Sequence, residues 1–294
     1  MRVCRTIAEA RAAVAELPRP LGLVPTMGAL HAGHLSLVEA ADAACAAVAA
    51  SIFVNPLQFG PHEDYDRYPR DEARDLRLLE EAGTAITFVP TATEMYREGA
   101  ATTIRVTGPL TDTFEGASRP GHFDGVATVV AKLLMILQPD LLFLGQKDAQ
   151  QLAVVRRMVA DLDIPVRVVG LPIHREADGL AMSSRNAYLS EQQRALAPRF
   201  HHALELGAAA AANGSSGAQV RRIVAAELAA GSDGPTLALE YASVVDPESF
   251  AQISEPRRGC LLVAAARLGT VRLIDNVPVE GEHRATADEA EDRE

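Results

Sequence analysis

Two histidines stand three residues apart at the point where an apolar stretch gives way to a helical pattern. In the segment PTMGALHAGHLSLVEA, residues 25–40, His31 and His34 flank Gly33 and follow Gly28. Side chains three residues apart lie on one face of a helix, and the N–H groups at its N-terminus attract anions. The spacing therefore predicts a phosphate site, with the glycines allowing a close backbone approach. A histidine bonded to a loop carbonyl, with glycines that only serve turns, is the alternative.

Two further segments carry polar side chains beside apolar ones. Asn55 and Gln58 stand in FVNPLQF, residues 53–59, and a few polar groups in apolar surroundings suit a small hydroxylated acid. The segment MSSRN, residues 182–186, offers two hydroxyls and a guanidinium for clamping phosphate. An Asn-Pro turn with an exposed glutamine, and an ordinary Ser-rich loop, are the alternatives for these segments.

A third segment, GQKDAQQ at residues 145–151, follows the apolar run LLFL. Lys147 is one of only two lysines among 28 basic residues, and its ammonium would neutralise phosphate. The carboxylate of Asp148 would accept hydrogen bonds from ribose hydroxyls. The alternative is a surface lysine beside an aspartate that caps a helix.

These segments need a scaffold, and the first 175 residues alternate strand-like and helix-like patterns. The strand-like runs are Leu21–Pro25, Val48–Val54, Ala85–Pro90, Leu141–Leu144 and Val166–Leu171, and the helical stretches are His34–Ala47, Asp71–Ala82, Gly125–Gln138 and Gln150–Asp161. Buried apolar strands separated by helices predict an α/β fold, a Rossmann-like parallel sheet with helices on both faces. Ligands of such sheets bind beyond the carboxyl ends of the strands, where the polar segments fall.

A different pattern follows Asp178. Ser190 and Gln193 form a capping box that opens an Ala-rich helix to about Ala212, and a second helix extends to about Ala230. Strand-like runs follow at Leu237–Val245, Cys260–Arg267 and Val271–Asn276. We therefore expect a Rossmann-like domain at 1–174, a smaller C-terminal α+β domain at 175–281, and an acidic disordered tail at 282–294.

The composition argues against several classes of partner. The net charge of −11, without a Lys/Arg-rich block, argues against nucleic acid. Three cysteines without C-x-x-C spacing favour neither disulfides nor zinc and fit a reducing cytoplasm. Glu9 and Glu16 occupy the place of a signal peptide's apolar core, and the longest apolar run, residues 43–54, is too short to span a bilayer. We therefore expect a cytoplasmic protein without membrane or nucleic-acid partners.

The order of the motifs resembles that of the nucleotidylyltransferase superfamily, whose members attack the α-phosphorus of ATP and release pyrophosphate. Within it, the chain looks like the AMP-forming pantoate–β-alanine ligases. The matching motifs are PTMGALHAGHLSLV, FVNPLQF, YPR (68–70), RPGHFDGVATVVAKL (119–133), GQKDAQQL and DGLAMSSRNAYL (178–189). The resemblance implies condensation of (R)-pantoate with β-alanine to pantothenate through a pantoyl adenylate, with release of pyrophosphate and AMP.

The resemblance also implies a set of site residues. ATP would contact Met27, Gly28, Ala29, Leu30, His31, Ala32, Gly33, His34, Gly145, Gln146, Lys147, Asp148, His174, Met182, Ser183, Ser184 and Arg185. The catalytic groups, which would stabilise charge on the phosphates, are His34, His31, Lys147 and Arg185. Pantoate would contact Gln58, Gln151, Pro25, Met27 and Asn55, and β-alanine would contact Gln58.

Other properties follow from the same resemblance. ATP is a substrate, Mg²⁺ is held largely by ATP oxygens, and Asp75 is the candidate for a protein contact to the metal. A homodimer is implied, and the smaller domain would act as a lid that keeps water from the adenylate. Two positions depart from the family, because Ala149 replaces a frequent aromatic residue and His174 a usual aliphatic one. Neither departure removes a chemical group, so both bear on affinity and not on the reaction.

Three other functions are weighed against this one. Nucleotidyl transfer from ATP to another small acceptor uses the same superfamily motifs. An aminoacyl-tRNA synthetase core is opposed by the acidic charge and the short chain. A nucleotide-binding regulatory module would bind ATP without turning it over.

Overall fold

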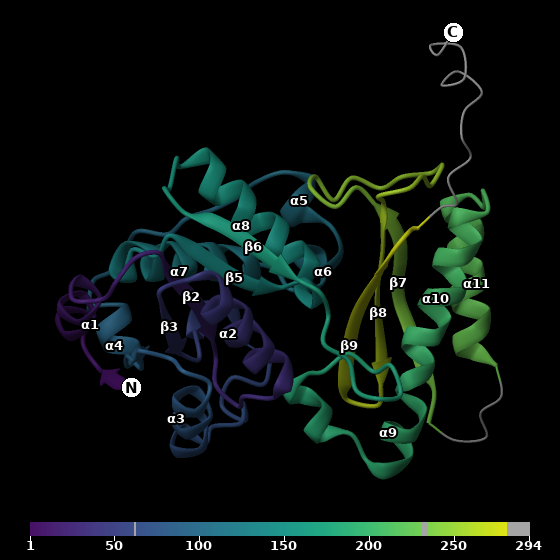
Figure 1. Cartoon of the computed structure of the whole chain (residues 1–294). Helices are drawn as coiled ribbons and strands as arrows, with labels where there is room; N and C mark the ends of the chain where they lie inside the picture. Colours follow the sequence, from purple (N-terminus) through teal and green to yellow (C-terminus); the bar gives the residue numbers. More distant parts are fainter. Residues whose placement is uncertain (62, 231–234, 281–294) are drawn as a thin grey trace, which may run out of the picture. The chain divides into compact units, whose positions relative to one another are not determined.

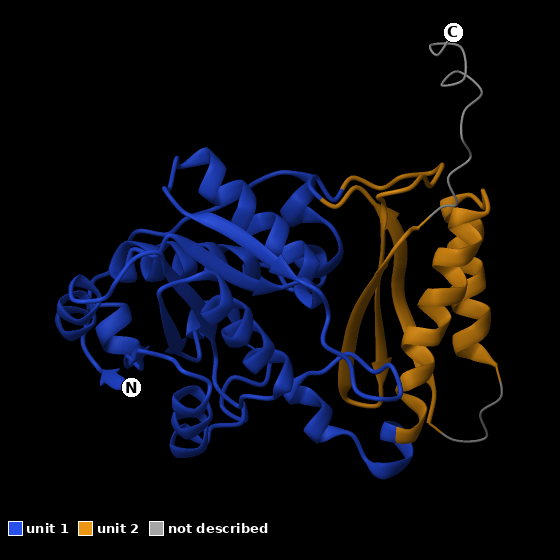
Figure 2. Ribbon diagram, viewed as in Figure 1, with its two compact units in different colours: residues 1–194, 248–250 blue, residues 195–247, 251–294 orange. Residues whose placement is uncertain are grey.

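The computed structural model describes residues 1–61, 63–230 and 235–280 of the chain. The chain divides into two compact units, which Figure 2 distinguishes by colour. Unit 1 comprises Met1–Arg194 and Glu248–Phe250, and unit 2 comprises Ala195–Pro247 and the chain from Ala251 onward. The acidic tail that we expect at 282–294 lies outside the described residues.

Unit 1 is built on a six-stranded parallel sheet (Figure 1) with the order β1-β4-β3-β2-β5-β6. The strands are β1 (Arg2–Cys4), β2 (Leu21–Thr26), β3 (Ala47–Ile52), β4 (Ile86–Phe88), β5 (Leu141–Gly145) and β6 (Arg167–Leu171). The order reverses at β2, because β3 lies on one side of it and β5 on the other. Such a reversal leaves a crevice at the carboxyl ends of the strands, where ligands of open α/β sheets bind.

Both faces of this sheet are apolar and covered by helices, as a parallel sheet requires. Leu21 and Leu23 of β2 belong to the core on one face, and Val24 belongs to the core on the other. The first face packs against α1 (Ile7–Ala15), α7 (His122–Leu137) and α8 (Ala149–Asp161), and the second against α2 (Ala32–Ala44) and α3 (Glu72–Glu81). The predicted α/β fold, with helices on both faces of a parallel sheet, is confirmed.

The remaining elements of unit 1 are short. They are η1 (Pro56–Gln58), α4 (Ala92–Met95), α5 (Pro109–Asp112), α6 (Phe114–Ser118), η2 (Gln146–Asp148) and η3 (Ser184–Tyr188), where η denotes a 3₁₀ helix. Our sequence-based prediction omits β1 and α1, although Thr6 and Glu9 form a capping box at the start of α1. Within the described part of the chain, no helix combines the length and apolarity needed to cross a membrane.

Unit 2 pairs helices with a small antiparallel sheet. Its strands are β7 (Leu237–Val245), β8 (Leu261–Leu268) and β9 (Val271–Pro278), paired in that order, and its long helices are α10 (Pro198–Ala212) and α11 (Gly217–Ala229). The predicted α+β domain is thus confirmed. The single Ala-rich helix predicted after Ser190 is wrong, because α9 (Glu191–Leu196) ends before Ala197 and a new helix begins at Pro198. Proline lacks the N–H that an unbroken helix would need there.

The boundary between the units differs from the one that we predict after residue 174. Residues 175–194 group with unit 1. Two side chains of this segment form hydrogen bonds to backbone carbonyls of earlier residues in unit 1. Ser184 Oγ donates to the carbonyl of Ala29 at 3.2 Å, and the Tyr188 hydroxyl donates to the carbonyl of Arg67 at 2.9 Å. The change of pattern after residue 178 therefore marks the end of the regular α/β alternation and not the end of the unit.

A close backbone contact in unit 1 gives a testable prediction. Gly125 of α7 lies against η1, and a Cβ there would lie 2.3 Å from the Leu57 carbonyl oxygen and 2.6 Å from the Gln58 nitrogen. Alanine normally stabilises a helix relative to glycine by about 1 kcal/mol. Here η1 would have to move, so we expect Gly125→Ala to lower the free energy of unfolding by about 2–3 kcal/mol, measured by urea denaturation.

Gly145→Ala is the matched control, because a Cβ at Gly145 would meet no heavy atom within 4 Å. Its unfolding free energy should stay within about 0.5 kcal/mol of the parent value. A Gly125→Ala protein as stable as this control would contradict the close contact between α7 and η1.

Candidate active site

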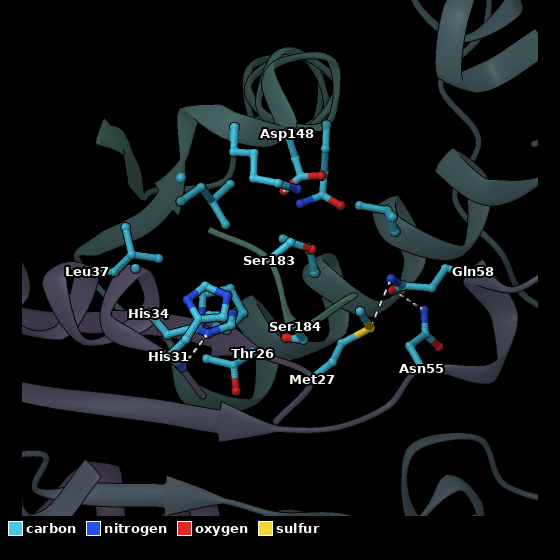
Figure 3. A pocket seen from close by; sticks show the side chains of 18 of the residues that line it. Thr26, Met27, His31, His34, Leu37, Asn55, Gln58, Asp148, Ser183 and Ser184 are labelled. Atoms are coloured by element: carbon cyan, nitrogen blue, oxygen red, sulfur yellow. Dashed lines mark hydrogen bonds and ion pairs between the residues drawn. The ribbon is translucent and has the colours of Figure 1, made fainter. Parts of the chain in front are cut away.

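A pocket opens beyond the carboxyl ends of β2, β3 and β5, where the strand order reverses. Strand β2 and the residue after it contribute Pro25, Thr26 and Met27, and β5 contributes Leu144 and Gly145. Figure 3 shows His31 and His34 on one side of the pocket, and Gln58 and Asn55 on the other. All the lining residues belong to unit 1.

The pocket brings together most of the residues predicted from separate motifs. Those that line it are Pro25, Met27, His31, Gly33, His34, Asn55, Gln58, Gly145, Lys147, Asp148, Gln151, His174, Met182, Ser183, Ser184 and Arg185. They are spread from residue 25 to residue 185, so the fold gathers them from strand ends and helix starts.

One buried carboxylate anchors the loop between β2 and α2. Asp75 of α3 is 1% exposed, and its two oxygens accept hydrogen bonds from the N–H groups of Ala29 (2.7 Å) and Leu30 (2.8 Å). Arg74 adds a third tie, because its Nη1 donates to the Leu30 carbonyl at 2.9 Å. These charge-assisted hydrogen bonds make the start of α2 depend on α3.

Three backbone N–H groups of this loop already have partners within the protein. The Gly28 N–H donates to Thr26 Oγ1 at 3.2 Å, and the next two N–H groups donate to Asp75. Gly28 and Ala29 have φ values of 83° and 50°, so the loop turns through the left-handed region that favours glycine. The predicted ATP contacts that do not line the pocket are Gly28, Ala29, Leu30, Ala32 and Gln146.

His31 and His34 stack at the N-terminus of α2, with ring centroids 4.1 Å apart. Gly33 permits this packing, because a Cβ there would lie 3.1 Å from the His31 ring. The His31 N–H donates to Nδ1 of His34 at 3.4 Å, so the neutral His34 ring carries its proton on Nε2. Burial and the charge of Lys147 lower the pKa of His31 to about 4, and burial and His31 lower the pKa of His34 to about 3. Both rings are therefore neutral near pH 7, and a neutral imidazole has one N–H to offer.

Gln58 enters the pocket from η1, and its neighbours hold its amide. Asn55 Nδ2 donates to Gln58 Oε1 at 3.0 Å, and Gln58 Nε2 donates to the sulfur of Met27 at 3.2 Å (Figure 3). Asn55 also donates to the carbonyl of Gly125 at 3.1 Å and is 1% exposed. The polar atoms of its side chain are thus engaged by the protein, and Asn55 holds the amide of Gln58 in place.

The N-terminal end of α7 adds a polar network to which we assign no role from the sequence. Arg119 donates to both carboxylate oxygens of Glu63, at 2.7 and 2.6 Å. Arg119 Nη1 lies 3.0 Å from Nε2 of His122, whose Nδ1 lies 2.9 Å from the Gln58 carbonyl. A guanidinium only donates and a carbonyl only accepts, so His122 is neutral with its proton on Nδ1. Burial and the charge of Arg119 lower the pKa of His122 to about 4.

The other lining residues are mostly apolar. Besides Arg119 and His122, those without a predicted role are Thr26, Leu37, Ser51, Phe53, Tyr68, Val126, Val129, Val130, Leu133, Leu144, Pro172 and Ile173. An apolar stripe of α7, within the stretch 125–138 that we predict as a helix, therefore forms one wall of the pocket. Helical periodicity marks such a stripe as buried but does not say whether a ligand covers part of it. The motif at 119–133 is the sequence signal that could have placed these residues in the pocket.

The cationic side chains in the pocket already have carboxylate neighbours. Arg185 donates from Nε and Nη2 to Asp64 at 2.9 and 2.8 Å. Burial raises the pKa of Asp64, but the hydrogen bonds from Arg185 outweigh burial and hold that pKa below its ordinary value. Lys147 Nζ lies 3.8 Å from Asp148 Oδ2. A bound phosphate must therefore displace these acids or use the N–H groups that they do not engage.

The carboxylates do not assemble into a metal site. Across residues 1–61, 63–230 and 235–280, no three His, Cys, Asp or Glu side chains are grouped so as to hold a metal ion. Asp75, the predicted contact for Mg²⁺, is buried, and both its oxygens are engaged by backbone N–H groups. Asp75 thus does not fit as a ligand of Mg²⁺ and is a loop anchor.

The fold and the pocket together define a class of protein. A parallel sheet that opens, where its strand order reverses, into a pocket lined by histidines and by cations with carboxylate neighbours places the chain among the Rossmann-like α/β proteins. The family model described as Pantoate-beta-alanine ligase matches residues 2–278. The chain belongs to this family, which confirms the resemblance of its motifs.

Relatives match the chain over nearly its whole length. The pantothenate synthetase of Chloroflexus aggregans is 54% identical over 277 residues, which are 94% of this chain and 99% of that protein. The crystal structure of pantothenate synthetase from Thermus thermophilus has a TM-score of 0.90 and 51% identity, covering 95% of this chain and 100% of that one. The pantoate-beta-alanine ligase of Francisella tularensis, complexed with beta-gamma ATP and beta-alanine, has a TM-score of 0.78 and 30% identity, with coverages of 95% and 98%.

The anchoring role of Asp75 is open to a direct test. Asp75→Asn turns an NH₂ group toward one of the two backbone N–H groups, so one buried donor loses its acceptor and the other bond loses its charge. We expect the free energy of unfolding, measured in urea, to fall by about 2–4 kcal/mol. Glu81→Gln removes the same charge from an exposed position of α3 and should change it by less than about 0.5 kcal/mol. Equal losses in the two proteins would exclude the anchor.

The neutral histidines make stability depend on pH. Folding holds His122 neutral down to about pH 4, whereas an unfolded histidine takes up a proton near pH 6.5. Below pH 6.5 the unfolded state binds more protons than the folded state. The contribution of His122 to the free energy of unfolding is therefore fully present above about pH 6.5 and is lost as the pH drops toward about 4. One histidine shifted this far contributes about 3 kcal/mol. His31 and His34 act in the same direction.

His122→Gln tests this dependence, because glutamine can donate to the Gln58 carbonyl and accept from Arg119 without titrating. We expect its unfolding free energy to fall less steeply than that of the parent between about pH 6.5 and 4. His202→Gln removes a histidine whose side chain is 57% exposed and should keep the parent slope. If the unfolding free energy of His122→Gln also falls with pH as steeply as that of the parent, the His122 ring is not held neutral.

Proposed function

We propose that this protein condenses (R)-pantoate with β-alanine in an ATP-dependent reaction, through a pantoyl adenylate, and releases pyrophosphate and AMP. The observation that supports this function most directly is that one pocket holds two kinds of group. Its donors suited to phosphate are His31, His34, Lys147 and Arg185, and its amides suited to a small acid are Gln58 and Gln151. An acid at the amides would therefore lie in the same cavity as the phosphates of ATP. The complex of the Francisella tularensis ligase with beta-gamma ATP and beta-alanine supports two of the three substrates.

The nucleotide takes the histidine and lysine side of the pocket in this proposal. His31 and His34 donate N–H groups to phosphate oxygens without carrying a charge themselves, and Lys147 adds a positive charge. Asp148, with a side chain 47% exposed, offers its carboxylate to the ribose. The remaining proposed contacts are Met27, Gly33, Gly145, His174, Met182, Ser183, Ser184 and Arg185.

The acid substrate takes the part of the pocket that Gln58 enters. Gln58 and Gln151 donate to its oxygens, Pro25 and Met27 provide apolar contact, and β-alanine approaches beside Gln58. The apolar wall of α7 suits the hydrocarbon part of a small acid and keeps water from it.

The chemistry needs no protein nucleophile. A carboxylate is a poor electrophile, so an oxygen of the pantoate carboxylate first attacks the α-phosphorus of ATP, and the bond to the bridging oxygen breaks as pyrophosphate leaves. The amine of β-alanine then attacks the acyl carbon, loses a proton and expels AMP. Negative charge grows on the phosphate oxygens in the first step, and fixed donors aimed at them lower its barrier.

Mg²⁺, a homodimer, a cytoplasmic location and a lid function of unit 2 are further parts of this proposal, and each rests on the sequence. Because the described carboxylates form no metal cluster, the Mg²⁺ would arrive on the oxygens of ATP. The protein's own contribution is to orient the two substrates and to stabilise charge with its side chains.

Pyrophosphate exchange tests the proposed function. With ATP, pantoate and Mg²⁺ but no β-alanine, the enzyme should incorporate labelled pyrophosphate into ATP, because the carboxylate is the only nucleophile of the first step. Exchange without pantoate would indicate nucleotidyl transfer to another acceptor, and a strict need for β-alanine would exclude the two-step route. Binding of ATP with no turnover would indicate a regulatory module.

The same assay tests the role of His34. His34→Ala should lower the exchange rate at least about 100-fold, the scale of losing one charge-stabilising donor. His202→Ala, an exposed histidine of unit 2, is the control and should exchange at the parent rate. A folded His34→Ala protein with near-parent exchange would remove His34 from the proposed machinery.

A further inference from the structure

The side-chain amide of Asn55 has a single possible orientation. The backbone N–H of Leu57 donates to its Oδ1 at 3.3 Å, and its Nδ2 donates to the backbone carbonyl of Gly125 at 3.1 Å. A backbone N–H only donates and a carbonyl only accepts, so exchanging the amide's two ends would set like groups against each other. Asn55 is 1% exposed, so water does not offer an alternative partner.

This orientation fixes the hydrogen-bonding roles of two neighbours. The hydroxyl of Tyr96, 2.7 Å from Asn55 Oδ1, must donate its proton. The atom of Gln58 that lies 3.0 Å from Asn55 Nδ2 must be Oε1. Gln58 Nε2 therefore faces the sulfur of Met27, 3.2 Å away (Figure 3). A thioether is a weak acceptor, so the NH₂ group of Gln58 has capacity for a stronger one.

Tyr96 makes the shortest of the four hydrogen bonds formed by the side chain of Asn55. Its ring packs near Phe53, with centroids 6.1 Å apart, and it directly follows α4 without lining the pocket. Burial raises the pKa of the Tyr96 phenol, so the hydroxyl keeps its proton and remains a donor.

We propose that Tyr96 is a positioning residue for the acid substrate. Its hydroxyl holds Asn55, and Asn55 holds the amide of Gln58 with the NH₂ group turned toward the pocket. The subsite therefore presents a donor and takes an oxygen that only accepts, as a carboxylate oxygen does. The inference rests on the proposed placement of pantoate at Gln58.

Tyr96→Phe removes the donor and keeps the ring. In pyrophosphate exchange with ATP, Mg²⁺ and pantoate, we expect KM for pantoate to rise about tenfold, the effect of one buried hydrogen bond. KM for ATP and the rate at saturating pantoate should change by less than about twofold. Tyr241→Phe makes the same chemical change in unit 2 and should leave all three unchanged. An unchanged KM for pantoate in a folded Tyr96→Phe protein, checked by thermal unfolding, would overturn the inference.

A double-mutant cycle separates this inference from the proposed function. If Tyr96 acts through Gln58, then Tyr96→Phe has no further effect on KM for pantoate once Gln58→Ala is present, whereas independent effects multiply. Effects that multiply would overturn the role of Tyr96. An unchanged KM for pantoate in Gln58→Ala alone would overturn the placement of pantoate instead.

Gln58→Glu tests the direction of the donor. Glutamate keeps an oxygen for Asn55 but turns a second oxygen, in place of the NH₂ group, toward the substrate. We expect KM for pantoate to exceed that of Gln58→Ala, because two acceptors would then face each other. A KM equal to or below that of Gln58→Ala would overturn the assignment of a donor to this subsite.

Discussion

The two hydrogen bonds that Asp75 accepts from the loop after β2 are the constraint on which the rest of the site depends. A buried carboxylate is costly unless donors replace the water it has lost, and here two adjacent backbone N–H groups do so. The loop can supply both only by turning through left-handed conformations at Gly28 and Ala29. The position of His31 at the start of α2, and hence the stacking of the histidine pair, follows from that turn.

The electrostatics of the pocket differ from those of a simple cationic cleft. His31, His34 and His122 are neutral, and the arginines Arg119 and Arg185 are paired with Glu63 and Asp64, two consecutive residues of one loop. A phosphate that contacts these arginines therefore replaces a carboxylate. The free energy gained is the difference between the interactions of the two anions with the guanidinium groups.

Much of the fold and part of the site could be predicted from the sequence, because both leave local signals. The central strands are continuous apolar runs, and H-x-G-H stands at the end of one of them. Other features depend on contacts between distant segments. Asp75 looks like an ordinary acid in the first turn of a helix, and nothing local shows that its partners are the N–H groups of Ala29 and Leu30. The break at Pro198 is masked by the alanines around it, which continue the helical pattern on both sides.

Gly125, which lets the backbones of α7 and η1 touch beside Gln58, has a further use as a marker. Every other amino acid carries a Cβ, so a replacement at this position displaces η1 and, with it, Gln58. In a related chain known only from its sequence, glycine at this point of the helix together with Asn-Pro-x-Gln in the earlier loop would indicate an intact acid subsite, even where most lining residues differ. A chain that keeps the loop motif but has another residue at the helix position would have to hold its acid in a different way.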